Sequence, residues 1–160
     1  MKLEEIKLGL KVRDVITGLE GILTSITESL SGTVQVGIQP RGDGDKIAES
    51  WCIDYQSVDV IDEGVSARLP AIDDTVVVQL GDEVEDLVSG HRGMTTRKII
   101  FVNGCVHFTV TGKINKDKRA LEENLDHKTL KVIGVGLSKR APEPAKKTKT
   151  GGPMTRAPRL

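Results

Sequence analysis

Two stretches of the chain share one pattern: LGLKVRDVITGLEG at residues 8–21 and LGDEVEDLVSGHRG at residues 80–93. The second stretch begins 72 residues after the first, and the same offset continues without a gap to Ile61 and Ile133. It gives 15 identities in 54 positions, which is more than chance provides. The chain therefore carries an internal duplication, and a duplication of this kind predicts two structural modules in tandem.

Glycine recurs at equivalent places in the two copies. These glycines are Gly18, Gly21, Gly32, Gly90, Gly93 and Gly104. Glycine is the residue that tolerates a positive φ or the close approach of another backbone segment. We therefore expect the six glycines to mark structural turns.

The residues between the glycines are typical of short strands. Residues 12–16 and 22–27 flank a glycine-bounded turn, residues 33–39 alternate between apolar and polar, and a last strand is predicted at residues 58–61. In the alternating strands the predicted inward residues are Val34, Val36 and Ile38 in the first copy and Val106, Phe108 and Val110 in the second. The sequence predicts an all-β protein of two small SH3-like barrels or bent sheets. A helical turn is expected at residues 120–124.

The organisation along the chain follows from the repeat. We expect a first module at residues 1–62, a linker at 63–74, a second module at 75–137 and a tail at 138–160. No apolar run approaches the roughly 20 residues that cross a bilayer. The first ten residues lack the apolar segment of a signal peptide, so synthesis in the cytoplasm of the producing cell is expected.

The net charge of zero conceals an acidic body and a basic tail. Residues 1–138 hold 16 Lys/Arg and 22 Asp/Glu, whereas residues 139–160 hold seven Lys/Arg and a single Glu. The basic residues of the tail are Lys139, Arg140, Lys146, Lys147, Lys149, Arg156 and Arg159. Such asymmetry is typical of an interaction arm. The Pro- and Lys-rich composition predicts that the tail has no fold of its own.

The carboxylates and histidines give no clear catalytic pattern. Acid chemistry usually needs two converging carboxylates, but Asp14 and Asp86 are supplied one to each module, so we interpret them as hydrogen-bond acceptors in the following turn. The histidines are His91, His107 and His127, and no His-x-x-x-His or Cys-x-x-Cys spacing is present to hold zinc. We expect no metal or other cofactor.

The two cysteines are too few for a disulfide scaffold. Cys52 and Cys105 occupy different positions in the repeat, and neither has a nucleophile pattern around it. Each is interpreted as a small apolar residue, with a bond between modules or subunits as the alternative. The Gly- and Asp-rich residues 41–45 match neither a phosphate-binding loop nor a calcium loop and predict a solvated hairpin loop.

Two resemblances rest on these residues. The openings of both modules, residues 8–21 and 80–93, look like the first strand and turn of KOW and SH3-like small barrels. They also resemble small phage and prophage proteins with the pattern Leu-Gly-x-x-Val-x-Asp-x-(Val/Ile)-Thr-Gly-x-x-Gly followed by an aromatic-Leu-Asn-Gly-Cys turn. That turn is kept best at residues 101–105 and is changed at residues 29–33. The resemblance covers each module but not the tail, and it implies a phage origin rather than an activity.

Three functions are compatible with this reading. The first is a non-enzymatic virion protein, such as a capsid decoration or head-associated protein, that docks through its β modules and its tail on other virion subunits as a homo-oligomer or lattice. The second is a KOW-like nucleic-acid-binding protein that uses the tail together with Lys11, Arg13, Arg92, Arg97 and Lys98, although the acidic body counts against it. The third is a phage accessory protein that binds a host-defence factor or a small molecule. We expect no enzyme, no membrane partner, and a location in the virion.

Overall fold

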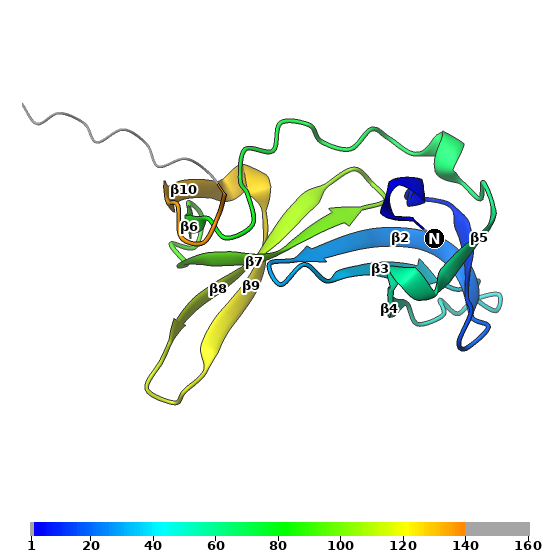
Figure 1. Ribbon diagram of the computed structural model, residues 1–160, viewed down its shortest axis with the longest axis horizontal. Coiled ribbons are helices and arrows are strands. Elements are labelled where there is room, and N and C mark those ends of the chain that lie inside the picture. The colour runs from blue at the N-terminus through cyan, green and yellow to red at the C-terminus, as the bar shows by residue number, and fades with distance from the viewer. Residues whose placement is uncertain (1, 140–160) are drawn as a thin grey trace, which may run out of the picture.

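The strands form one antiparallel sheet in the computed structural model, which describes residues 2–139 (Figure 1). The first half of the sheet contains β1 (Lys11–Asp14), β2 (Glu20–Ser29), β3 (Val34–Gln39), β4 (Trp51–Asp54) and β5 (Val58–Asp62). The second half contains β6 (Glu83–Asp86), β7 (Arg92–Phe101), β8 (Val106–Ile114), β9 (Ala120–Asp126) and β10 (Leu130–Gly134). The described helices are 3₁₀ turns: η1 (Leu3–Glu5), η2 (Tyr55–Ser57), η3 (Ser66–Arg68) and η4 (His127–Thr129). The predicted all-β class is confirmed.

The two halves have the same order of strands. It is β5–β1–β2–β3–β4 in the first half and β10–β6–β7–β8–β9 in the second. Strands β1, β2, β3 and β5 each begin 72 residues before β6, β7, β8 and β10. Among the described residues β4, β5, β9 and β10 each pair with one neighbour only, so the sheet is open. Of the two forms that the sequence predicted, the open sheet agrees with bent sheets and not with closed barrels.

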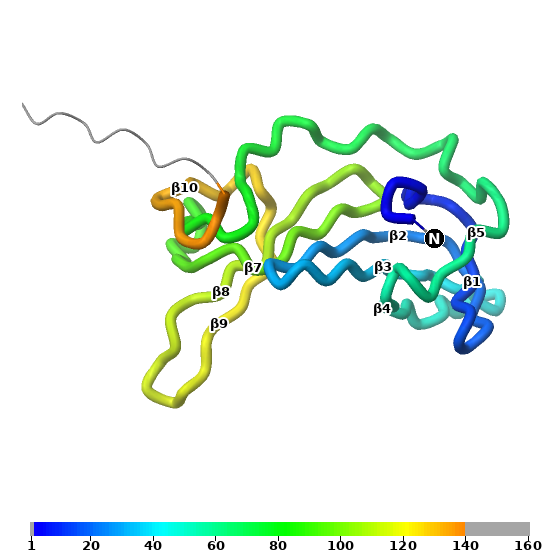
Figure 2. Tube along the Cα trace, in the orientation of Figure 1, coloured from blue at the N-terminus to red at the C-terminus, as the bar shows by residue number. Residues whose placement is uncertain are grey.

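Strands β2 and β7 join the halves and run antiparallel to each other in the centre of the molecule (Figure 2). Thr27 lies opposite Ile99, which is its own counterpart 72 residues later. Two further backbone hydrogen bonds are related in the same way: the Leu30 N–H donates to the Thr96 carbonyl, and the Val102 N–H donates to the Thr24 carbonyl, both at 2.8 Å. The halves are therefore related by an approximate two-fold axis, as subunits are in an isologous dimer.

Each half has its own apolar core. The fully buried side chains of the first core are Val12, Leu23, Val36, Ile38 and Val58. Those of the second are Val84, Val106, Phe108 and Val110. The inward faces predicted from strand alternation are thus buried, except that Val34 is only half-buried. Ile100 on β7 packs against both cores and connects them.

The turn glycines lie where a side chain is not tolerated. Gly18 and Gly90 have φ of +76° and +75°, and Gly32 and Gly104 have +89° and +85°. Gly21 and Gly93 do not have a positive φ, but a Cβ at either position would collide with the carbonyl of the neighbouring strand. The glycines that recur in the repeat are therefore explained either by a positive φ or by the close approach of a neighbouring strand.

The expected helical turn at residues 120–124 is wrong. These residues belong to β9, because they pair with β8 along most of its length. The β8–β9 hairpin is also paired over more of its length than the β3–β4 hairpin (Figure 1). Pro40 has no N–H and β3 ends before it, whereas Gly112 stands at the equivalent position and β8 continues to Ile114. The second half therefore carries a more extensively paired β8–β9 hairpin that projects from the body of the molecule (Figure 2).

The similarity of the two halves continues past the expected module ends. The Val65 N–H donates to the Gly9 carbonyl at 2.8 Å, and the Leu137 N–H donates to the Gly81 carbonyl at 2.9 Å. The described part of the expected tail, Ser138 and Lys139, follows directly on this contact. The rest of the tail lies outside the described residues.

Substitution of Val106 by Asp tests the second core. Val106 is 1% exposed, so an unpaired carboxylate there should lower the free energy of unfolding by at least about 3 kcal/mol. Val34→Asp, at the half-buried counterpart, should cost clearly less. Urea unfolding measures both variants, and equal losses would contradict the assigned faces.

Candidate functional site

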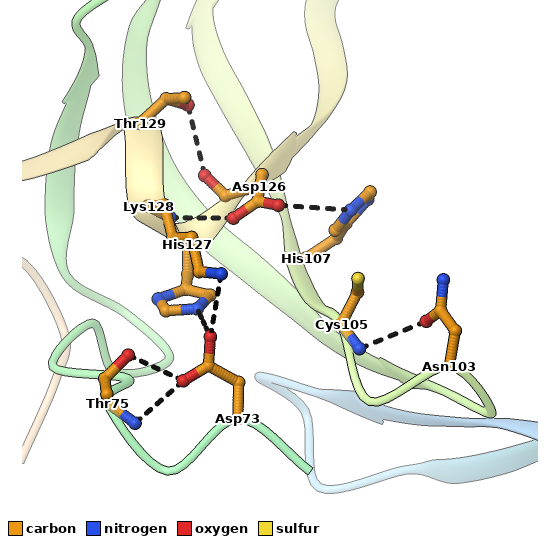
Figure 3. A network of polar contacts seen from close by, with 9 residues as sticks. All are labelled: Asp73, Thr75, Asn103, Cys105, His107, Asp126, His127, Lys128 and Thr129. Atoms are coloured by element: carbon orange, nitrogen blue, oxygen red, sulfur yellow. Dashed lines mark hydrogen bonds and ion pairs between the residues drawn. The ribbon is translucent and has the colours of Figure 1, made fainter. Parts of the chain in front are cut away.

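A network of polar contacts fixes the linker onto the second half (Figure 3). The Asp73 carboxylate accepts hydrogen bonds from the Thr75 backbone N–H at 2.9 Å, from the Thr75 hydroxyl at 2.6 Å and from His127 Nε2 at 3.0 Å. Lys128 Nζ lies 3.3 Å from the same carboxylate. The Thr75 hydroxyl, then the Thr75 N–H, then His127 hold the pKa of Asp73 well below its usual range. His127 is buried, and its role here is to anchor the linker.

Cysteine, histidine and aspartate also gather beside this anchor (Figure 3). His107 Nε2 lies 3.9 Å from Asp126, and its ring meets Phe101 edge to face with ring centres 5.1 Å apart. Within residues 2–139 the Cys105 thiol makes no hydrogen bond to His107 (Figure 3). The third histidine, His91, bonds through its ring to the Val110 carbonyl at 3.2 Å.

Asp14 and Asp86 act separately, each within its own turn. The Asp14 carboxylate accepts the Thr17 hydroxyl at 2.5 Å and the Thr17 N–H at 2.9 Å. Asp86 accepts the Ser89 hydroxyl at 2.6 Å and the Ser89 N–H at 2.8 Å. The Thr17 hydroxyl lowers the pKa of Asp14, and the Ser89 hydroxyl, with help from Thr129, lowers the pKa of Asp86 to about 2. Both carboxylates brace the β1–β2 and β6–β7 turns.

An apolar pocket lies in the first half. This pocket of about 430 Å³ opens between the β1–β2 turn and strand β4. Its lining residues are Asp14, Ile16, Thr17, Gly18, Leu19, Trp51, Cys52 and Ile53. Trp51 is 54% exposed and Ile16 is 79% exposed, so large apolar side chains stand in solvent at the rim. The hydrogen bonds of Asp14 hold the turn that forms one wall.

The thiol in this pocket is not activated. The Cys52 Sγ–H donates to Gln35 Oε1 at 3.7 Å. Partial burial raises the pKa of the Cys52 thiol, although Arg97 opposes the effect. A raised pKa keeps the thiol protonated and weakens it as a nucleophile. Both cysteines are free thiols in the structure.

The second half has different chemistry at the equivalent positions. Glu123 stands where the first half has Trp51, and Asn124 stands where it has Cys52. Two of the pocket's side chains are therefore not repeated in the second half, and sequence reasoning missed the pocket because β4 has no alternating pattern. A comparison of the two copies, with the chain's one tryptophan opposite a glutamate, would have drawn attention to this position.

The cations expected to contact nucleic acid are largely engaged with carboxylates. Lys11 Nζ lies 3.7 Å from Glu20, and Arg13 Nε donates to Glu20 at 2.8 Å. Arg92 lies 3.1 Å from Glu85. Arg97 and Lys98 lie on β7 in its pairing with β2. Of the tail cations, Lys139 is exposed and Arg140, Lys146, Lys147, Lys149, Arg156 and Arg159 lie outside the described residues.

Residues 2–139 hold no cluster of three or more His, Cys, Asp or Glu that could bind a metal ion. In the same part of the chain no helix has the length and hydropathy to cross a bilayer.

Replacement of Asp73 by Asn should lower the free energy of unfolding at neutral pH. It should also make that free energy fall less steeply as the pH decreases. The folded-state pKa of Asp73 lies below its ordinary value, so its contribution is complete above about pH 4 and is lost as the pH falls. Urea unfolding between pH 7 and pH 3 measures both effects. Asp74→Asn is the control, because Asp74 is exposed and adjacent. Parallel pH profiles for wild type and Asp73→Asn would contradict the anchoring role.

Comparisons of the chain with protein-family models, curated proteins and solved structures found no match.

Proposed function

We propose that the protein is a non-enzymatic binding protein that docks on protein partners through the pocket beside Trp51. The observation that carries this proposal is the exposure of Trp51 and Ile16 at the rim of an apolar cavity. Tryptophan is enriched among the residues that dominate binding energy at protein interfaces. Covering these side chains removes apolar area from water, which is worth about 25 cal/mol per Å².

The lining favours an apolar side chain of a partner as the occupant. Leu19, Ile53 and Trp51 supply apolar surface. Asp14 is the one carboxylate in the lining, and its hydrogen bonds to Thr17 already occupy it. The pocket therefore offers shape and apolar contact rather than charge, as the centre of a protein interface does.

The state of the reactive groups supports a non-enzymatic role. Asp14 and Asp86 are committed to turns in different halves, and the Cys52 thiol has a raised pKa. Electrophilic or acid–base chemistry needs such groups to converge with matched pKa values. Binding is the activity that this arrangement serves.

The setting we propose is the bacteriophage virion, in which the protein is a structural or decorating subunit. The resemblance of both modules to small phage proteins supports this setting, and so does a basic tail on an acidic body. A second candidate is a phage accessory protein that binds a small molecule or host-defence factor, because a volume of about 430 Å³ also falls in the range of small-molecule sites.

Replacement of Trp51 by Glu tests the docking surface. The second half carries Glu123 at this position, so the fold should accept the change. We expect Trp51→Glu and Ile16→Glu to reduce incorporation into purified phage particles at least tenfold, as measured by quantitative mass spectrometry. A tenfold loss corresponds to about 1.4 kcal/mol, which is within reach of one interface residue.

The matched control is Val88→Glu, at the counterpart of Ile16 in the second half. Val88 is 81% exposed, so it tests whether any exposed aliphatic residue matters equally. Equal incorporation of all variants and the wild type would refute docking through this pocket. Binding of a small metabolite that shifts the fluorescence of the single tryptophan, without incorporation, would favour the second candidate.

Truncation after Ser138 tests the tail. The Ser138 hydroxyl still donates to the Val135 carbonyl at 2.7 Å, so the described fold keeps its last contacts. We expect the truncated protein to remain as stable as the full chain but to enter particles less efficiently, because the removed residues hold seven cations. Unchanged incorporation of the truncated protein would show that the tail does not contribute to docking.

A further inference from the structure

The β8–β9 hairpin is an arm that only the second half possesses. Strands β8 and β9 extend beyond the part of the sheet that has a counterpart in the first half (Figure 1). The tip is closed by two backbone hydrogen bonds, from Asn115 N–H to the Arg119 carbonyl at 2.8 Å and from Lys118 N–H to the Asn115 carbonyl at 3.0 Å. The hairpin is therefore an ordered two-stranded ribbon that projects into solvent.

The arm is basic although the body is acidic. Residues 112–121 hold four cations and one carboxylate, whereas the equivalent residues 40–49 hold two cations and three carboxylates. The four cations are Lys113, Lys116, Lys118 and Arg119, and all are exposed. Within residues 2–139 none of them forms an ion pair, in contrast to Lys11, Arg13 and Arg92. The arm thus gathers cations that are free to meet an external anion.

Lys118 also occupies a strained position. Its φ is +58°, and among the described residues it is the only non-glycine residue with a positive φ. Hairpin loops of this kind place glycine at such a position, because glycine accepts a positive φ without a steric cost. A lysine here adds a charge to the tip where glycine would give a more stable turn.

We propose that this arm binds the phosphate backbone of duplex DNA. A two-stranded β-ribbon fits the major groove of B-DNA, and clustered Lys and Arg side chains neutralise phosphates. Residues 112–121 contain no aromatic side chain, so they lack the platform on which unpaired bases stack. Glu122 and Glu123 begin the acidic stem of β9, which limits the contact to the tip. The site is separate from the pocket beside Trp51 and extends the proposed function to a second class of partner.

Two matched double variants of the full chain test this proposal. Lys113→Gln with Lys118→Gln removes two cations from the arm, and Arg41→Gln with Lys46→Gln removes two cations from the equivalent loop. Binding to a labelled duplex of about 24 base pairs is measured by fluorescence anisotropy between roughly 50 and 200 mM salt. The tail is present in every protein, so its contribution is the same throughout.

The arm variant should bind at least about fivefold more weakly at 100 mM salt, with a log–log salt slope lower by about 2, because each lost phosphate contact removes about 0.9. The loop variant should bind like the wild type. Lys118→Gly separates binding from folding, since it should raise the urea midpoint while weakening DNA binding. Equal effects of the two double variants, undiminished binding by Lys118→Gly, or binding to anionic lipid vesicles but not to DNA would overturn the proposal.

Discussion

The antiparallel pairing of β2 with β7 is the interaction on which the rest of the structure depends. Each half alone is a small open sheet, and a sheet of about 60 residues buries too little apolar surface to be secure. The pairing covers one side of each central strand and brings Ile100 into contact with both cores. Because Thr27 lies opposite its own counterpart Ile99, the contact has the geometry of a two-fold interface formed within one chain.

Because the two halves share one strand order and one type of core, they can differ on their edges and loops. The buried turn carboxylates Asp14 and Asp86 and the core residues maintain the same strand order in both. Single substitutions then change what each half presents. Pro40 stops β3 where Gly112 lets β8 continue, and Trp51 provides an apolar rim where Glu123 provides a charge. These differences lie on edges and loops, where they alter the surface without disturbing the core.

The features that could be predicted from the sequence are those encoded locally. Strand alternation identified the buried faces of β3 and β8, and paired glycines identified the turns. Strand β9 could not be predicted, because Ala120–Asp126 is rich in Glu and is a strand only through its pairing with β8. Asp73 and His127 meet across 54 residues, and the β2–β7 pairing joins the two halves, so no local pattern announces either contact. The pocket was not predicted because strand β4, which forms one of its walls, was not predicted either.

The two proposed binding surfaces lie on different halves of the molecule, which an approximate two-fold axis relates. The pocket beside Trp51 is built from the end of β1, the β1–β2 turn and β4 of the first half, and the basic arm is built from β8 and β9 of the second. Different partners therefore do not compete for the same side chains. The β2–β7 pairing is part of a continuous ladder of hydrogen bonds, and a ladder of this kind is stiffer than a flexible linker. A protein partner held by one half and a nucleic acid held by the other would consequently be kept in a defined relative position, which neither half could achieve alone.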